Sequence, residues 1–398
     1  MPSDPGAQAS EGISLSVPQI EGNEWAYVKE CFDTGWVSSG GAFVERFERE
    51  FATRVGIANA VATSSGTAAL HVALLVAGVE PDDEVLVSTL TFIAPVNAIR
   101  YVGAWPVLID AEPDYWQMDP EKAVSFLDNE CAWREGELRN RATGHRVKAI
   151  LPVHVLGHPV DLDPILEAAR RYGLSVIEDA TESLGARYKG RTVGTLADIA
   201  CFSFNGNKMI TTGGGGMIVA SNDARAQRAR HLTTQAKADP LEYVHDEIGF
   251  NYRLTNVQAA IGCAQLEQLD RFVEAKREVA AIYDEVLREV PGITPMAESP
   301  HATSAFWMYT ISVDEQHYGM DSRELLRLLG EAGVQTRPLW EPMHKSLPHR
   351  SAQACGGAVA ESLYRTCLSL PCSVGLAQDQ ARWVARLVAE AATKGSTG

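Results

Sequence analysis

A single lysine stands where its amino group could act as a nucleophile. Lys208 follows an apolar stretch that ends at Ser203, and a glycine run at 213–216 comes shortly after it. A lysine amine adds to carbonyl compounds and forms Schiff bases with them. Glycines let the backbone pass close to a bulky, flat ligand, because they adopt positive φ without steric cost. The segment therefore predicts that a flat carbonyl compound is attached at Lys208.

A carboxylate precedes this lysine at the end of another strand-like stretch. Residues 175–178 form that stretch and deliver Asp179 at its carboxyl end. An aspartate that faces a pyridine nitrogen, with a lysine for the aldehyde, is the pairing that pyridoxal 5′-phosphate (PLP) requires. Asp179 would keep the nitrogen protonated, and Lys208 would carry a proton between the reacting carbons. We therefore expect Asp179 and Lys208 to be the catalytic residues of a PLP enzyme, although an aspartate here could also simply cap a helix.

The turn at Gly66 and Thr67 could seat the phosphate group. It follows a strand-like stretch and opens a helical one, and the N–H groups at a helix start suit an anion. Ser64 and Ser65 lie in the same turn, and serines also cap helices that bind nothing. The order of this turn, the aspartate and the lysine favours the phosphate site.

For Phe92 and Glu182 the sequence allows both a cofactor contact and a purely structural role. Phe92 follows a strand-like stretch and could stack on the cofactor ring or belong to the core. Glu182 could hydrogen-bond the hydroxyl side of the ring, or complete a capping box with Asp179.

Composition narrows the class of protein. The 398 residues are 45% hydrophobic and 22% charged, with a formal net charge of -16. Such an acidic chain argues against nucleic-acid or acidic-membrane binding, although a few arginines could still hold an anionic substrate. The seven cysteines include no C-x-x-C pair, so we expect reduced thiols and no metal site. The most apolar window, residues 68–78, is too short to span a bilayer, and we expect a cytoplasmic protein.

Short apolar runs alternate with helical stretches, which predicts an α/β fold with a mainly parallel sheet that is buried on both faces. We expect a flexible N-terminus at 1–14, a large PLP-binding domain at 15–270 and a small α+β domain at 271–398. The expected strands are 60–62, 84–88, 105–109, 149–153, 175–178, 199–203, 216–220 and 305–313. The expected helices are 67–77, 95–102, 162–171, 255–268, 272–290, 322–332 and 378–392.

Seven ordered motifs resemble those of the DegT/DnrJ/EryC1/StrS family of sugar aminotransferases, which are PLP enzymes of fold type I, the aspartate aminotransferase-like fold. The resemblance covers about residues 15–390. The motifs are Gly35–Gly40, Ser64–Leu70, Thr91–Ala94, Pro152–Gly157, Glu178–Gly185, Ser203–Lys208 and Gly249–Leu254.

The resemblance implies roles for individual residues. Ser203 would join Gly66 and Thr67 at the phosphate, and Phe92 would stack on the ring. Asn251 would reach the phosphate of the neighbouring subunit's cofactor, which implies a homodimer with shared active sites. The residues matching positions that line the substrate cleft are His154, Arg253, Arg337 and His344. For His154 a buried structural role, and for Arg337 a surface ion pair, are the alternatives.

Many relatives carry histidine or glutamine at the position of Glu182, and this chain also has an insertion at about 129–146. In these features it resembles a subgroup linked to legionaminic-acid and bacillosamine-type sugars. This implies transfer of an amino group from L-glutamate to C4 of a UDP-linked 2-acetamido-4-keto-2,6-dideoxyhexose, for bacterial surface glycans or nonulosonic acids. The alternatives are a 3-keto nucleotide-sugar aminotransferase and a non-catalytic PLP-binding regulatory protein. Sugar 3-dehydratases of this fold carry histidine at the Schiff-base position, so Lys208 argues against that activity.

Overall fold

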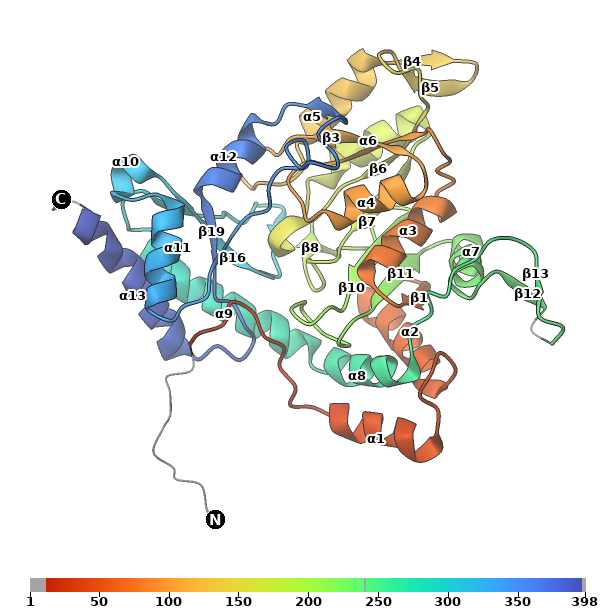
Figure 1. Cartoon of the computed structure of the whole chain (residues 1–398), viewed down its shortest axis with the longest axis horizontal. Coiled ribbons are helices and arrows are strands. Elements are labelled where there is room, and N and C mark those ends of the chain that lie inside the picture. Colours follow the sequence, from red (N-terminus) through yellow and green to blue (C-terminus); the bar gives the residue numbers. More distant parts are fainter. Residues whose placement is uncertain (1–11, 240, 396–398) are drawn as a thin grey trace.

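An eight-stranded sheet forms the centre of the protein (Figure 1). The computed structural model describes residues 12–239 and 241–395. Apart from β11, which runs antiparallel to both of its neighbours, the strands pair in parallel. In spatial order they are β1 (Asn59–Thr63), β11 (Gly216–Ala220), β10 (Ile199–Ser203), β7 (Ser175–Asp179), β6 (Val147–Leu151), β2 (Glu84–Ser88), β3 (Trp105–Ile109) and β18 (Gln353–Cys355).

Helices cover both faces of this sheet, which is why its strands are apolar almost throughout. Val85 and Val87 of β2 pack on one face with α3 (Gly66–Val76), α4 (Ala94–Tyr101) and α7 (Asp223–Thr233). The other face packs against α2 (Ala42–Val55), α5 (Pro120–Ser125), α6 (Leu162–Tyr172) and α8 (Asn256–Leu266). Parallel sheets need this double cover. The predicted α/β class and the mainly parallel sheet are confirmed.

A second, antiparallel sheet lies towards the C-terminal end, in the order β14 (Ile293–Pro295), β16 (Tyr309–Val313), β19 (Cys367–Leu370) and β17 (Arg337–Pro338). The long helix α9 (Leu269–Leu287) runs from α8 to this part of the molecule (Figure 1). The other helices of this part are α10 (Glu315–Tyr318), α11 (Ser322–Glu331), α12 (Ala358–Thr366) and α13 (Gln378–Gly395).

Two segments cross the boundary that we expect near residue 270. Strand β18 comes from the C-terminal part but pairs with β3 in the large sheet. Ile13, from the expected flexible N-terminus, bridges to Val334 of the C-terminal part. These two pairings join the expected parts to one another, and the expected domain bounds stay a prediction. Residues 1–11 lie outside the described part.

The insertion between α5 and β6 is a short hairpin with a buried anchor. A π-helical turn, Phe126–Glu130, leads into β4 (Cys131–Arg134) and β5 (Glu137–Asn140). Glu84 at the start of β2 accepts hydrogen bonds from Asn140 Nδ2 at 2.8 Å and Thr143 Oγ1 at 2.7 Å. The insertion is therefore fixed to the amino end of β2, inside the sheet.

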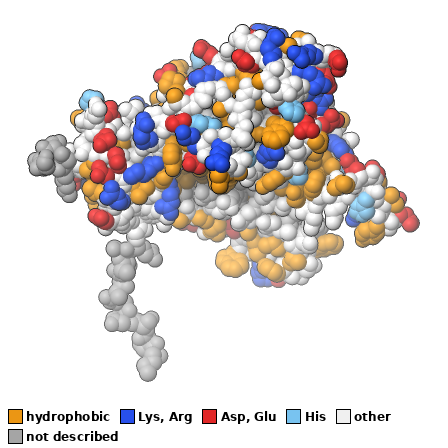
Figure 2. Space-filling view, turned by 45° about the horizontal axis from the view of Figure 1, so that its top comes forward, with side chains coloured by type: hydrophobic (Ala, Val, Ile, Leu, Met, Phe, Trp, Pro, Cys, Tyr) orange, Lys and Arg blue, Asp and Glu red, His pale blue; other side chains and the backbone are white. Residues whose placement is uncertain are grey.

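Two projecting elements carry exposed apolar side chains (Figures 1 and 2). One is α1 (Glu24–Thr34), where Trp25 is 83% exposed. The other is the hairpin of β12 (Lys237–Asp239) and β13 (Val244–His245), which carries Leu241 and is followed by Ile248. The remaining short elements are the turn Val155–Gly157 and the strands β8 (Arg187–Tyr188), β9 (Arg191–Thr192) and β15 (Ala302–Thr303). No helix in the described ranges is both long and apolar enough to cross a membrane.

Candidate active site

A cavity of about 400 Å³ opens at the carboxyl ends of the central strands. Asp179 ends β7, Ser203 ends β10, and α3 begins just after β1. Consecutive parallel strands bring such ends to one edge of a sheet, where α/β proteins bind their ligands. The sequence-predicted residues that line the cavity are Gly66, Thr67, Phe92, Asp179, Glu182, Ser203 and Lys208.

The amino group of Lys208 lies beside a buried carboxylate. Its Nζ is 3.3 Å from Glu182 Oε1, and Glu182 Oε2 accepts the Leu156 N–H at 2.9 Å. Burial raises the pKa of Glu182, and the charge of Lys208 opposes that shift. Glu182 is therefore engaged by the lysine and does not form the capping box with Asp179 that the sequence left open.

Asp179 is 2% exposed and faces the cavity. Its Oδ1 accepts the Thr181 N–H at 3.1 Å. Burial raises the pKa of Asp179, while hydrogen bonds from Thr181 and the positive charge of Lys208 oppose that shift. A cationic N–H placed against this carboxylate would stabilise its ionised form. Asp179 therefore fits the protonated nitrogen of a pyridine ring.

The first turn of α3 forms a close backbone approach to β10. Ser65 caps the helix by accepting the Ala68 N–H at 3.0 Å, so the capping role that the sequence also allowed for this serine is present. A Cβ at Gly66 would lie 2.8 Å from Ser203 Cβ, which leaves no room for a side chain there. Helix N–H groups and a serine hydroxyl thus converge on one small space, as an anion site requires.

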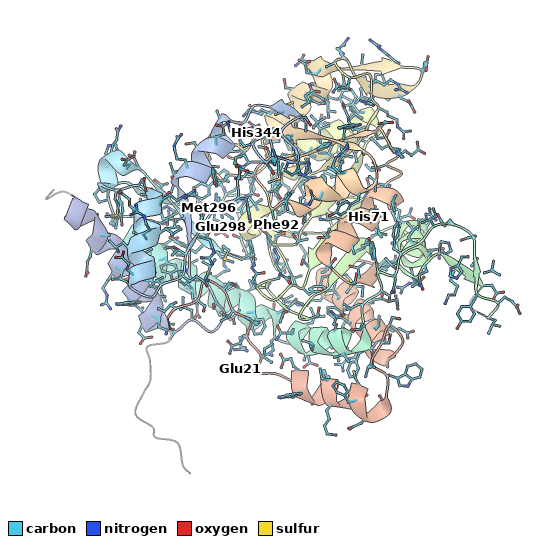
Figure 3. The ribbon with its side chains drawn as sticks, viewed as in Figure 1. Glu21, His71, Phe92, Met296, Glu298 and His344 are labelled. Atoms are coloured by element: carbon cyan, nitrogen blue, oxygen red, sulfur yellow. The ribbon has the colours of Figure 1, made fainter. Side chains whose placement is uncertain are left out.

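The remaining walls also suit a flat, polar ligand. Phe92 is 54% exposed at the cavity and lies near the middle of the molecule, as Figure 3 shows. Thr91 Oγ1 is buried in the lining and has no hydrogen-bond partner within the described ranges. An aromatic face, an unpartnered hydroxyl, an anion seat, a carboxylate and a lysine together match the donor set that PLP needs.

His154 lies outside the lining of this cavity. Its side chain is fully buried: Nδ1 accepts the Val160 N–H at 3.0 Å, and Nε2 lies 3.2 Å from Glu178 Oε2. Burial raises the pKa of Glu178, but the hydrogen bonds from His154 and from the N–H groups of Gly194 and Ala197 outweigh it, so that this pKa is lowered. The structure therefore supports the alternative of a buried structural role for His154, paired with Glu178 of β7.

The two arginines of the expected substrate set also lie outside the lining. Arg253 Nη1 donates to Oε1 of the buried Glu48 on α2 at 3.1 Å, which is a structural pairing. Arg337 is exposed in β17 and donates to the Thr336 carbonyl at 2.9 Å. Among the described residues, neither arginine contacts the groups around Lys208.

His344 is tied to two partners near the cavity. Its Nδ1 lies 2.8 Å from Thr89 Oγ1, and its Nε2 lies 3.0 Å from Glu361 Oε1 of α12. Figure 3 shows it away from Phe92, in the direction of α12. The ring is thus held by the protein and does not line the cavity.

Asn251 is exposed and lies at the foot of the projecting hairpin, where its backbone bridges to Thr234. It is not part of the cavity lining of its own chain.

The structure adds two residues that the sequence reasoning missed. Trp307 and Trp340 line the cavity and stack with their ring centroids 6.4 Å apart and an interplanar angle of 6°. Lys208 Nζ lies 3.9 Å from the Trp307 ring centroid. Trp307 belongs to the apolar run 305–313, where an aromatic residue is indistinguishable from core, so no local signal marks it.

No metal site is expected from the sequence. The structure gathers His231, Asp246 and Glu247 at the surface with ligand atoms within 4.8 Å of one another. Arg228 already pairs with Glu247, and His231 with Asp246 at 2.7 Å. The three side chains are thus already engaged with one another and with Arg228.

Known proteins are similar over nearly the whole chain. A family model described as the DegT/DnrJ/EryC1/StrS aminotransferase family matches residues 18–389. GDP-perosamine synthase of Caulobacter vibrioides is 40% identical over 372 residues, which cover 92% of this chain and 94% of the relative. The putative PLP-dependent aminotransferase EpsN of Bacillus subtilis is 38% identical, with 92% of each chain covered. The structure of DesV from S. venezuelae in complex with a ketimine intermediate has a TM-score of 0.83 at 32% identity, covering 93% of this chain and 94% of that one.

Proposed function

Because the chain belongs to the DegT/DnrJ/EryC1/StrS aminotransferase family, and is therefore a PLP-dependent sugar aminotransferase of fold type I, we propose that it transfers an amino group from L-glutamate to C4 of a nucleotide-linked 4-keto-6-deoxyhexose. The observation that carries the proposal is the single cavity that joins Lys208, Asp179 and the first turn of α3. One lysine, one buried carboxylate and one anion seat are the protein groups that this chemistry needs.

The relatives favour GDP as the nucleotide. GDP-perosamine synthases from three bacteria are 40%, 39% and 34% identical to this chain. We rank the UDP-linked 2-acetamido sugar implied by the subgroup resemblance second. The acceptor we place first is a GDP-linked 4-keto-6-deoxyhexose, and the product is the corresponding 4-amino sugar for polysaccharide biosynthesis.

The residues divide the work as follows. PLP, when bound, supplies an electron sink for the charge that develops as a proton leaves the carbon bearing nitrogen. Asp179 would hold a proton on the ring nitrogen, and Phe92 would lie against the ring. The α3 turn and Ser203 hold the phosphate through charge-assisted hydrogen bonds. Lys208 Nζ removes the proton from the glutamate Cα in the first half-reaction and returns a proton to the sugar C4 in the second.

Glu182 supports the lysine in this scheme. It is the carboxylate nearest to Nζ, and its second oxygen is fixed by the Leu156 N–H. Leu156 itself has a positive φ of 61°, a conformation that costs energy for a leucine. The backbone is thus held in an unfavourable conformation where it orients the partner of Lys208.

We further propose a homodimer in which Asn251 reaches the phosphate bound by the other subunit. Its exposure outside its own cavity supports this arrangement, as do the apolar side chains that project from α1 and the β12–β13 hairpin. We place the enzyme in the cytoplasm, because all seven cysteines are free thiols, as expected in a reducing compartment.

Absorbance tests the proposal in two steps. The purified protein with PLP should absorb near about 410–420 nm and bleach with L-glutamate. The band should return on adding the GDP-linked 4-keto sugar, and mass spectrometry should detect the amino sugar. Return only with the UDP-linked 2-acetamido-4-keto sugar would reverse our ranking of nucleotides. Return only with a 3-keto nucleotide sugar, with the amino group at C3 by NMR, would establish the 3-keto alternative. If the band appears with PLP but neither the amino acid nor a keto sugar changes it, the aminotransferase activity is contradicted and a regulatory protein is favoured.

A further inference from the structure

Trp307 is fixed to the polypeptide next to Lys208. Its indole Nε1 donates to the Asn207 carbonyl at 2.7 Å, one residue before the lysine. Its backbone N is so close to Gly157 that a Cβ on that glycine would lie 2.6 Å away. The hydrogen bond holds the ring next to Lys208, and the close packing at Gly157 holds the backbone that carries the ring.

A buried lysine holds the other side of Trp307. Lys276 of α9 is 2% exposed, and its Nζ donates to the Trp307 carbonyl at 3.1 Å and also to the Cys372 carbonyl. A buried ammonium is costly unless it is hydrogen-bonded, and here both acceptors are backbone carbonyls. Burial lowers the pKa of Lys276. None of the catalytic steps described above uses this group.

The fixed ring lies directly against the Lys208 amino group. Nζ is 3.9 Å from the ring centroid on one side and 3.3 Å from Glu182 Oε1. A cation over an indole face is attracted by the ring's negative face. A lysine side chain has four rotatable bonds, so without such a surface its amino group would sample many positions.

We propose that Trp307 positions the Lys208 amino group for its reactions, and that Lys276 acts through Trp307 by fixing it. The inference rests on the proposed role of Lys208 and extends it to two residues outside the cofactor set. Lys208 must remain within reach of two carbons through the whole cycle. Contacts to both the Trp307 ring and Glu182 restrict the positions that its amino group can take.

The test measures how fast PLP adds to Lys208 in the full-length protein freed of cofactor. Addition is followed by absorbance and, after borohydride reduction, by the mass of the peptide that contains Lys208. Trp307→Leu should slow addition about tenfold, and Trp307→Phe about threefold, because phenylalanine keeps a ring face but loses the indole N–H. Lys276→Met should slow it to a similar degree as Trp307→Phe.

Arg277→Gln is the matched control for Lys276. Arg277 is the next residue of α9, and it donates hydrogen bonds to Glu298 and to the Ser304 carbonyl. Ser304 lies close to Trp307 in sequence, but these hydrogen bonds do not involve Trp307 itself. This variant should add PLP at the wild-type rate. If it slows addition as much as Lys276→Met does, the role of Lys276 is merely structural and that part of the proposal is wrong.

Wild-type addition rates in Trp307→Leu, or in Trp307→Phe and Lys276→Met if the leucine variant does not fold, would overturn the role of Trp307. Failure of the wild-type protein itself to add PLP at Lys208 is a different result: it would contradict the proposed function and remove the basis of this inference.

Discussion

Replacing Gly66 by alanine should damage the phosphate seat while leaving the fold nearly intact. The new methyl group would lie 2.8 Å from Ser203 Cβ, 3.1 Å from its Oγ and 3.4 Å from Thr181 Cγ2. Such overpacking costs about 1–3 kcal/mol. Alanine in place of glycine stabilises a helix by up to about 1 kcal/mol, so the net loss of stability should be about 0–3 kcal/mol.

The substitution should also weaken binding of the cofactor. Relief of the contact must push Ser203 or the α3 turn away from the position that both need at the phosphate. We expect PLP affinity to fall by about 10- to 100-fold, which corresponds to roughly 1.4–2.8 kcal/mol. Equilibrium titration of the cofactor-free protein measures this affinity, and thermal unfolding measures the stability.

A neighbouring glycine supplies the control. A Cβ at Gly206 would meet nothing within 4 Å, so Gly206→Ala should change neither quantity. The double variant Gly66→Ala/Ser203→Gly should recover stability but not affinity, because it restores space and removes the hydroxyl. Wild-type PLP affinity in Gly66→Ala would refute the assignment of this turn to the phosphate.

Three more predictions address single residues. Lys208→Ala should reduce turnover below detection yet remain folded, because its side chain borders a cavity, where its amino group contacts Glu182 and Trp307; measurable transamination would contradict its role. Asn251→Ala should weaken PLP retention in dialysis without changing the cavity of its own chain, and unchanged retention would argue against a contact between subunits. His154→Gln should flatten the acid side of the stability curve: the lowered pKa of Glu178 gives stability that is present above its ordinary pKa of about 4.3 and is lost as pH falls through the lower folded value. Urea unfolding from about pH 6 to 3 measures this slope, and an unchanged slope would refute the pairing.

The sequence predicted best what depends on local pattern. The runs 84–88 and 105–109 are strands at those residues, because buried parallel strands are apolar over their whole length. Asp179 and Lys208 could be found because chemically active side chains follow such strands. The resemblance to a known family added the order of the motifs, and the match over residues 18–389 agrees with it.

What the sequence could not show depends on distant partners. His154 follows a strand just as a site residue would, but Glu178 and Val160 engage both of its ring nitrogens and remove it from the cavity. Trp307 is the reverse case, since its place beside Lys208 arises from contacts to Asn207 and Lys276. The three-residue strand β18 has too short a pattern to be recognised before its partner β3 is known.

The position of β18 bears on how the chain can be made and divided. Val107 of β3 pairs with Gln353, and Asp110 accepts N–H groups from Gly357 and Ala360, so one edge of the large sheet is completed only by residues near the end of the chain. During synthesis, the backbone groups on this side of β3 stay unpaired until residues 353–355 have been made, and unpaired strand edges promote association with other chains. A fragment that stops at residue 270 would keep every cofactor residue and still carry that open edge, so we expect it to aggregate.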